Sequence, residues 1–294
     1  AAMGQPSTCY LNGEMLPLEQ AGISVFDRGF LFGDGVYELL PVYAGVPFRL
    51  AEHLRRLRRS LEAVRIPSPL SDAEWGALLE RLCRANGSGD LAVYIQVTRG
   101  SPGQRSHEFP AQAQPTVFAM TSALPPRGAY ARGVAAVTAE DPRWSRCDIK
   151  AVSLLPNVLL RQQAVDAGAY EAILHRDGLV TEGAASTVFT VRDGVLATPR
   201  LHEGLLPGVT REVILELAER HGLAYQRRPI AVEELAEAQE IWLSSSSKEV
   251  LPVVSLDDRP VGDGRPGEAF AAMRGWFDAL RAEVEAAGGT GGMR

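Results

Sequence analysis

Lysine is the residue type that first draws attention in this chain, because it is nearly absent. Of the 30 basic residues, only Lys150 and Lys248 are Lys, and all the others are Arg. An Arg side chain stays protonated, whereas a desolvated Lys amine can lose its proton and attack a carbonyl group. Lys150 is therefore a candidate Schiff-base nucleophile. An Arg-rich coding bias that leaves two Lys by chance explains the same count, so the surrounding residues must decide.

If Lys150 carries pyridoxal phosphate, the cofactor needs an anion beside its pyridine nitrogen. The anion keeps this nitrogen protonated, so that the ring can accept electrons from the substrate. Glu182 is the candidate, since it follows Val180 and Thr181 at the end of a strand-like run. Taken alone, a Glu beside Gly183 is more often a turn residue.

The phosphate group requires backbone N–H groups and cationic or hydroxyl donors, which a helix N-terminus offers. The run Leu206-Pro-Gly-Val-Thr210 fits this requirement, because Gly208 permits close backbone approach and Thr210 can cap the helix that follows. That amphipathic helix ends at Gly222. Ser244-Ser-Ser-Ser247, at the end of a strand, adds hydroxyl groups. On its own, a run of Ser is usually a flexible loop.

A carboxylate on the substrate calls for an Arg fork or a cluster of polar donors. Arg105-Ser-His107 lies in a loop rich in Gly and Pro, where both side chains could converge on one anion, although a solvated surface pair is the plainer interpretation. Tyr37 adds an aromatic hydroxyl just after a turn. Gly33-Asp-Gly35 is not a nucleotide loop, because it lacks the third Gly and a strand before it.

Periodicity predicts the elements that position these residues. In the first half we expect strands over 36–43 and 91–98, with Pro41 implying an edge position or a bulge. Between them lie a helix with an apolar stripe from Leu50 to Val64 and a second helix that opens with the capping-box pattern Ser71-Asp-Ala-Glu74. In the second half, strands over 134–138, 170–174, 187–191 and 240–243 alternate with helices over 155–167 and 211–221.

Two domains are indicated by length and by one break in the pattern. The segment Thr121-Ser-Ala-Leu-Pro-Pro-Arg-Gly128 combines Pro-Pro with Gly between apolar strands, which is typical of a linker. We therefore predict a smaller α/β domain over residues 1–122, a linker over 123–128 and a larger domain over 129–286. The glycine-rich residues 287–294 are expected to form a flexible tail.

Composition excludes several classes of partner. A net charge of −6 and a pI near 5.5 argue against nucleic acid, and the one dense basic run, Arg55 to Arg59, reads by itself as a solvated helix face. No apolar stretch is long enough to span a membrane, and the N-terminal residues do not show the charged-then-apolar pattern of a leader, so we expect a soluble, unexported protein. The three Cys are widely separated and the five His lack ligand spacing, so we expect no metal and a reduced, cytoplasmic setting.

Taken together, these positions resemble one family, the fold-type IV pyridoxal-phosphate transaminases, and within it the bacterial D-amino-acid transaminases. The resemblance covers roughly residues 10–280. It rests on seven ordered blocks: Arg28-Gly-Phe-Leu-Phe-Gly-Asp-Gly-Val-Tyr-Glu38, Glu52-His-Leu-Arg-Arg56-Leu, Tyr94-Ile-Gln-Val-Thr-Arg-Gly100, Arg143-Trp-Ser-Arg-Cys-Asp-Ile-Lys150, Tyr170-Glu-Ala-Ile-Leu-His-Arg176, Val180-Thr-Glu-Gly183 and Leu206-Pro-Gly-Val-Thr-Arg211.

The resemblance implies an α/β (α+β) fold of two domains with the cofactor in the interdomain cleft, and a homodimer. It makes Lys150 the Schiff-base lysine and Glu182 the partner of the pyridinium nitrogen. Around the phosphate it places Arg56, the amides of Val209 and Thr210, and hydroxyls among Ser245, Ser246 and Ser247, with Leu206 against the ring face. Tyr37, Arg105 and His107 resemble the carboxylate trap, whose loop residues can come from the other subunit.

Three features depart from the family pattern. The loop from Arg99 to His107 is one residue longer than in the D-amino-acid transaminases. Thr187 stands where the wider family usually has Asn, and Ala184-Ala185 replace small hydroxyl residues. These changes reduce polar support around the cofactor without touching Lys150 or Glu182.

The sequence therefore predicts reversible transfer of an amino group between a D-amino acid and a 2-oxo acid such as 2-oxoglutarate. Lys150 would move the proton between the substrate Cα and the C4′ carbon of the cofactor. The alternatives on the same fold are a branched-chain L-amino-acid transaminase, an (R)-amine transaminase and an aminodeoxychorismate lyase. A catalytically silent cofactor-binding protein is the alternative from another class, and the presence of both Lys150 and Glu182 disfavours it.

Overall fold

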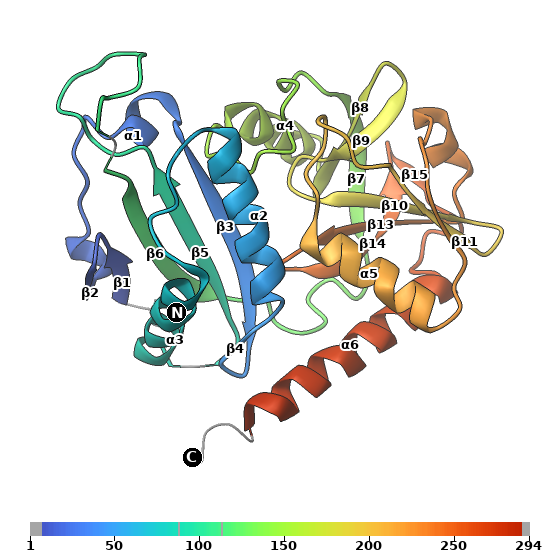
Figure 1. Ribbon diagram of the computed structural model, residues 1–294. Coiled ribbons are helices and arrows are strands. Elements are labelled where there is room, and N and C mark those ends of the chain that lie inside the picture. Colours follow the sequence, from blue (N-terminus) through green and yellow to red (C-terminus); the bar gives the residue numbers. More distant parts are fainter. Residues whose placement is uncertain (1–7, 88, 113, 290–294) are drawn as a thin grey trace. The chain divides into compact units, whose positions relative to one another are not determined.

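The computed structural model describes residues 8–87, 89–112 and 114–289, which divide into two compact units (Figure 1). The first contains residues 8–124, 149–154 and 282–289, and the second contains residues 125–148 and 155–281. The division after Leu124 falls within the segment predicted as a linker. The structure differs from the predicted larger domain at residues 149–154, because this segment pairs with strand β3 (Gly35–Tyr43) of the first unit.

The first unit is built on a six-stranded antiparallel sheet in the order β2-β1-β6-β5-β3-β4. Its other strands are β1 (Thr8–Leu11), β2 (Glu14–Pro17), β4 (Val46–Pro47), β5 (Leu91–Thr98) and β6 (Thr116–Ala123). Strand β3 lies near the edge, because only the two-residue β4 follows it. Its register with β5 is continuous through Pro41, so the edge position, rather than a bulge, explains this Pro.

Helices α2 (Leu50–Ala63) and α3 (Asp72–Ala85) pack on this sheet (Figure 1). The predicted apolar stripe of α2 is confirmed, since Leu54, Leu57 and Leu61 join the core. The predicted capping box of α3 is also present, because Ser71 and Glu74 bond to each other's backbone N–H. A short helix, α1 (Arg28–Phe32), precedes β3, and a single 3-10 turn spans Leu18–Gln20.

The second unit contains a nine-stranded mixed sheet in the order β12-β11-β10-β13-β14-β7-β8-β9, with β15 paired to β14. Strands β7–β8, β14–β7 and β11–β12 pair in parallel and the other neighbours antiparallel. The strands are β7 (Val134–Glu140), β8 (Glu171–Arg176), β9 (Leu179–Gly183), β10 (Thr187–Arg192), β11 (Val195–Thr198), β12 (Tyr225–Arg227), β13 (Glu240–Ser245), β14 (Glu249–Leu256) and β15 (Arg259–Pro260).

The helices of the second unit are α4 (Leu155–Asp166), α5 (Val209–Arg220) and α6 (Glu268–Gly289), with a 3-10 segment over Val232–Glu237. Helix α6 continues into residues counted with the first unit. The prediction that Thr210 caps α5 is wrong, because Gly208 is the N-cap residue and no side chain caps this end. In the predicted tail 287–294, α6 continues through Gly289, and residues 290–294 lie outside the described part of the chain.

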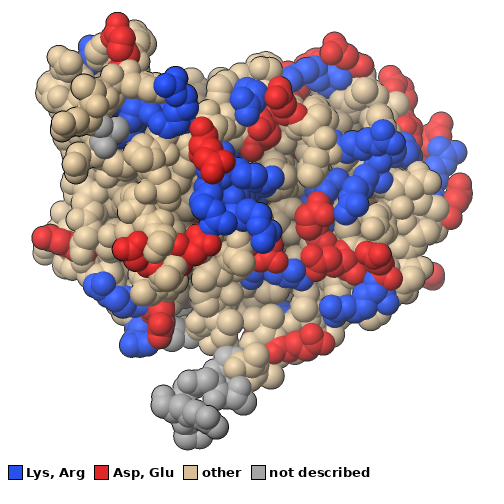
Figure 2. Space-filling model, in the orientation of Figure 1, with Lys and Arg blue, Asp and Glu red and all other residues tan. Residues whose placement is uncertain are grey.

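Charged side chains of both signs are interspersed over the face shown in Figure 2. None of the helices in the described ranges is long and apolar enough to cross a bilayer. Within the same ranges, no three His, Cys, Asp or Glu side chains gather in a way that could hold a metal ion.

Candidate active site

Lys150 lies beside the outer edge of strand β3. Its carbonyl oxygen accepts the N–H of Tyr37 at 2.9 Å, and the N–H of Val152 donates to the Gly35 carbonyl at 3.0 Å. The N–H of Lys150 itself donates to Ser60 Oγ on helix α2 at 3.2 Å. The edge strand leaves backbone groups available for such pairing. The main chain of Lys150 is thus held by two elements, and its Nζ lies 4.3 Å from the centroid of the Tyr37 ring.

Arg56 belongs to a buried cluster with Glu38 and His53. The Nε and Nη2 atoms of Arg56 donate to the two carboxylate oxygens of Glu38, at 2.7 and 2.9 Å. His53 Nδ1 lies 2.8 Å from Glu38 Oε2. All three side chains are almost fully buried. Arg56 is therefore buried and does not lie on the solvated helix face that the basic run suggested. Glu38 fixes the plane of its guanidinium group.

Burial acts on Glu38 and His53 with different outcomes. Burial alone would raise the pKa of the Glu38 carboxyl, but the charge and hydrogen bonds of Arg56, together with His53, hold it far below its ordinary value. For His53, burial dominates and lowers the pKa below its ordinary value of 6.5. At neutral pH, Glu38 is therefore ionised and His53 is a neutral donor to it.

The three residues assigned to the carboxylate trap form two groups in the first unit. Arg105 and His107 both lie against the ring of Phe32, with 5.0 Å from the Arg105 guanidinium carbon and 5.1 Å from the His107 ring to its centroid. Tyr37 instead stacks on Tyr94 and contacts Lys150. Within the described residues, no hydrogen bond or ring contact joins Tyr37 to Arg105 or His107.

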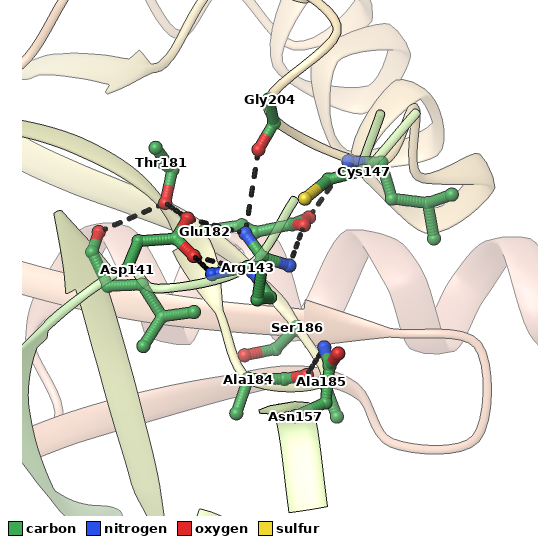
Figure 3. A network of polar contacts seen from close by, with 12 residues as sticks. Asp141, Arg143, Cys147, Asn157, Thr181, Glu182, Ala184, Ala185, Ser186 and Gly204 are labelled. Carbon is green, nitrogen blue, oxygen red and sulfur yellow. Dashed lines mark hydrogen bonds and ion pairs between the residues drawn. The ribbon is translucent and has the colours of Figure 1, made fainter. Parts of the chain in front are cut away.

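Glu182 belongs to a second buried cluster of charged side chains, which lies in the second unit (Figure 3). Its Oε1 accepts Arg143 Nη1 at 2.6 Å, and its Oε2 accepts the backbone N–H of Leu206 at 3.0 Å. The structure thereby brings together two predicted site residues, Glu182 and Leu206.

Arg143 is oriented in turn by Asp141. Its Nε and Nη2 donate to the two oxygens of Asp141, at 2.9 and 2.8 Å, and Thr181 Oγ1 donates to the same carboxylate at 2.9 Å. Burial raises the pKa of Asp141, but the hydrogen bonds and charge of Arg143 outweigh it and lower the pKa below its ordinary value. Arg143 thus bridges two buried carboxylates and favours the ionised form of Glu182.

The N-terminus of α5 presents an uncapped first turn. The backbone N–H groups of Val209 and Thr210 lie in the first turn, where the helix itself offers no carbonyl acceptor. No side chain caps this end of the helix either. A Cβ atom at Gly208 would lie 2.9 Å from Thr187 Oγ1, so Gly at this position lets the turn approach strand β10. Thr187 faces Ser244 in the β10–β13 register. The Ser244 hydroxyl is buried and has no hydrogen-bond partner among the described residues.

The predicted serines follow Ser244 directly. Ser245 ends β13, and Ser246 and Ser247 lie in the turn to β14. Helix α5 packs against β13. The second Lys of the chain, Lys248, contacts Ser247 Oγ at 3.4 Å.

Sequence reasoning missed Glu38, His53 and Arg143. Glu38 alternates with Val36 and Leu40 along β3, and an acid on the buried face of a strand signals a buried partner. His53 likewise falls three residues after Leu50 in the apolar stripe of α2. Arg143 had no such signal, because its partner Glu182 is 39 residues away in the chain.

Comparison with known proteins decides the family. The family model for Amino-transferase class IV matches residues 35–256. This chain belongs to that family. Class IV aminotransferases are pyridoxal-phosphate-dependent, and the predicted fold-type IV class is confirmed.

Two curated class IV relatives are D-alanine aminotransferases. That of Bacillus licheniformis is 41% identical over 257 residues, which cover 87% of this chain and 90% of the relative. That of Staphylococcus epidermidis is 39% identical over 271 residues, which cover 92% of this chain and 96% of the relative.

Solved structures of class IV relatives have the same fold. The branched-chain amino acid aminotransferase from Escherichia coli has a TM-score of 0.85 at 27% identity, covering 93% of this chain and 94% of that one. The branched-chain amino acid aminotransferase from Thermoproteus uzoniensis, solved with norvaline, has a TM-score of 0.86 at 26% identity, covering 96% of this chain and 97% of that one. A further branched-chain enzyme of this fold is complexed with N-(5'-phosphopyridoxyl)-L-glutamate.

Proposed function

We propose that this protein transfers an amino group reversibly between a D-amino acid, such as D-alanine, and a 2-oxo acid, such as 2-oxoglutarate. The observation that carries the proposal is the identity of 41% with a D-alanine aminotransferase over 87% of the chain. The surroundings of two residues support the proposal. The main chain of Lys150 is held by hydrogen bonds, and Glu182 is buried beside the cation Arg143.

The donor set fits pyridoxal 5'-phosphate. In the second unit, the uncapped first turn of α5 and the hydroxyls of Ser245, Ser246 and Ser247 suit a phosphate group. The carboxylate of Glu182 suits a protonated pyridine nitrogen. The backbone N–H of Leu206 donates a hydrogen bond to this carboxylate. In the first unit, we assign Lys150 and Arg56 as cofactor-binding residues.

The cofactor, when bound, supplies an electron sink for the bonds at the substrate Cα. Lys150 would provide the amine that holds the cofactor, and its Nζ, once the amino group of the substrate has displaced it, would take the proton from Cα. Its main chain is fixed by Tyr37 and Ser60, so the side chain starts from a defined position. Glu182, which accepts a hydrogen bond from the positively charged Arg143, would hold a proton on the ring nitrogen.

The carboxylate of the substrate is assigned to Tyr37, Arg105 and His107. Because Arg105 and His107 lie against Phe32 and not against Tyr37, we propose that two copies of the chain complete each trap, as a homodimer. Exposed apolar side chains in each unit support self-association: Phe30 in the first, and Leu155, Val158 and Leu159 on α4 in the second. A molar mass of one chain in light scattering would contradict the dimer.

A cytoplasmic location belongs to the same proposal. Cys9, Cys83 and Cys147 are free thiols, which is typical of proteins in reducing compartments. The expected partners are small amino acids and 2-oxo acids, and not nucleic acids or membranes.

The deciding experiment is the absorbance spectrum of the purified holoenzyme during separate additions of D-alanine, L-alanine, L-leucine and (R)-1-phenylethylamine. We expect the visible band of the bound cofactor to disappear with D-alanine alone. A response to L-leucine instead would favour branched-chain transamination, which the solved relatives make the second candidate. A response to the amine would indicate an (R)-amine transaminase.

The Lys150→Ala variant tests the assigned nucleophile. We expect turnover to fall by at least about 10²–10⁴-fold, because the general acid–base group is lost. The matched control is Lys248→Ala, which removes the other Lys and should retain turnover. Normal turnover in Lys150→Ala would contradict the mechanism.

A further inference from the structure

The segment from Arg28 to Asp34 has no part in the chemistry above, yet it contains a buried ion cluster. Asp34 Oδ2 accepts Arg28 Nε at 2.7 Å and Arg99 Nε at 2.8 Å, and Asp34 Oδ1 accepts Arg99 Nη2 at 3.0 Å. Arg28 is only 4% exposed and Arg99 only 2%. Burial would raise the pKa of Asp34, but hydrogen bonds from both Arg side chains lower it below its ordinary value.

The short helix α1, which contains Arg28, packs directly against strand β5. Asp27 caps it by accepting the N–H of Gly29 at 2.8 Å, and the same carboxylate accepts Thr98 Oγ1 at 3.0 Å. A Cβ atom at Gly29 would lie 2.3 Å from Thr98 Cγ2, so only Gly permits this approach. The base from which Arg28 projects is therefore closely packed against β5.

The remaining N–H donors of the Arg28 guanidinium group bind main-chain carbonyl groups of the loop that follows β5. Nη1 donates to the carbonyls of Ser106 and Glu108, and Nη2 donates to the carbonyl of His107 at 3.1 Å. These three carbonyls are consecutive, so a single guanidinium group fixes the backbone on both sides of His107 and next to Arg105. A fork of five N–H donors makes this possible, and Lys could not reproduce it.

Arg99 fastens the start of the same loop. It donates to the Val64 carbonyl at 2.7 Å and to the Arg65 carbonyl at 3.0 Å, just after α2 ends. Its guanidinium carbon lies 3.6 Å from the centroid of the Phe109 ring, beyond the Arg28 contacts. Asp34 links the two Arg side chains, so the loop is held at both ends through one carboxylate.

Phe32, the last residue of α1, supports the loop side chains. Its ring contacts the guanidinium carbon of Arg105 at 5.0 Å and the ring of His107 at 5.1 Å. The backbone clamp and the aromatic support thus come from the same five-residue helix.

We propose that Arg28 is a positioning residue for recognition of the substrate carboxylate. It acts through the loop, by holding the main chain that bears Arg105 and His107, and Phe32 fixes the direction of their side chains. This inference rests on the proposed function, which assigns those two side chains to the carboxylate.

The test compares the wild-type holoenzyme with Arg28→Lys and with Arg59→Lys, a matched control at an exposed position of α2. Hydrogen exchange of amides 101–109 reports the clamp, and half-saturation and maximal rate with D-alanine report its effect. In Arg28→Lys we expect faster exchange in this loop and a half-saturating concentration at least about tenfold higher, because small misplacements of binding groups are costly. The maximal rate should change by less than about twofold, because Arg28 does not touch the reacting atoms.

Unchanged exchange in Arg28→Lys would overturn the clamp, and faster exchange with unchanged half-saturation would overturn its role in recognition. A fall in maximal rate alone would do the same. If the wild type does not react with D-alanine, the proposed function fails, while the exchange experiment still decides whether Arg28 holds the loop.

Phe32→Leu provides a second route that keeps the hydrogen bonds of the buried ion cluster, while removing the contact of the Phe32 ring with the Arg28 guanidinium carbon at 5.0 Å. Loss of the ring contacts should raise half-saturation by D-alanine roughly two- to fivefold, which corresponds to one exposed cation–π contact. An unchanged value would contradict the supporting role of Phe32.

Discussion

Each unit buries a guanidinium group held by two arms on a carboxylate, Arg56 on Glu38 and Arg143 on Asp141, but the proposed function uses the guanidinium group in the first unit and a further carboxylate in the second. In the first unit the ligand-binding member is Arg56, and Glu38 orients it. In the second unit the ligand-binding member is the carboxylate Glu182, and Arg143, itself gripped by Asp141, orients it. The comparison teaches that residue type alone does not reveal which member of a buried pair serves the ligand.

Such pairs are weak evidence for stability, because desolvation offsets much of their attraction. We therefore interpret both clusters as devices for orientation. The cluster around Arg56 should govern how tightly the cofactor is held, whereas the cluster around Glu182 should govern how fast the reaction proceeds. Mutations in the two clusters can test this expected difference.

The largest effect is expected for Glu182→Gln. The amide keeps the shape of the side chain but not the charge that favours a protonated ring nitrogen, so kcat should fall roughly 10²–10³-fold, as for other lost electrostatic contacts. The fold should survive, because Arg143 keeps its paired bonds to Asp141. Steady-state kinetics and thermal unfolding measure the two quantities.

Asp141→Asn is the matched control for that variant. It removes the other carboxylate from Arg143 and leaves Glu182 in place, so stability should suffer more than kcat. An equal loss of kcat in both variants would erase the proposed distinction between the group that binds the ligand and the group that orients it.

An intermediate effect is expected for Arg56→Lys. An ammonium group cannot span both oxygens of Glu38, so the cofactor should bind more weakly by about 1.5–3 kcal/mol, which is roughly 10- to 100-fold in Kd. At saturating cofactor, kcat should remain near the wild-type value. Fluorescence titration of the apoprotein measures Kd, with Arg59→Lys on the same helix as the control. A loss of kcat without a change in Kd would reverse our assignment.

The smallest effect concerns pH. His53 has a pKa lowered below 6.5 by burial, so the unfolded chain binds a proton that the folded chain does not as the pH falls through 6.5. The wild type should therefore lose more stability than His53→Gln as the pH falls from about 7 to 5.5. The Asp141–Arg143–Glu182 cluster contains no His, so this slope distinguishes the two clusters. Parallel pH profiles of the melting temperature would contradict it.

Local signals predicted much of the fold and the roles of single residues. The capping box at Ser71 and the stripe through Leu54 and Leu57 depend on residues a few positions apart, and both are confirmed. The family and the D-amino-acid activity were also predicted, and the curated relatives support both. The domain boundaries and the individual ligand contacts stay predictions.

Nonlocal contacts explain what the sequence did not reveal. Lys150 was placed with the second domain by its position in the chain, but pairing with the edge of β3 joins it to the first unit. Arg143 begins the block that ends at Lys150, but the sequence assigned it no role, because only the fold brings it to Glu182. The cap assigned to Thr210 was wrong for a different reason, since Gly208 begins the helix and leaves its amides open.

The clamp of Arg28 has a consequence for how this enzyme can evolve. Arg28 bonds to carbonyl oxygens, which every amino acid possesses, and so it is indifferent to the side chains displayed at positions 105–108. Substitutions there change what the loop offers to a substrate without releasing the loop itself. Natural variation and directed libraries can therefore explore new amino donors at these positions while the scaffold stays constant.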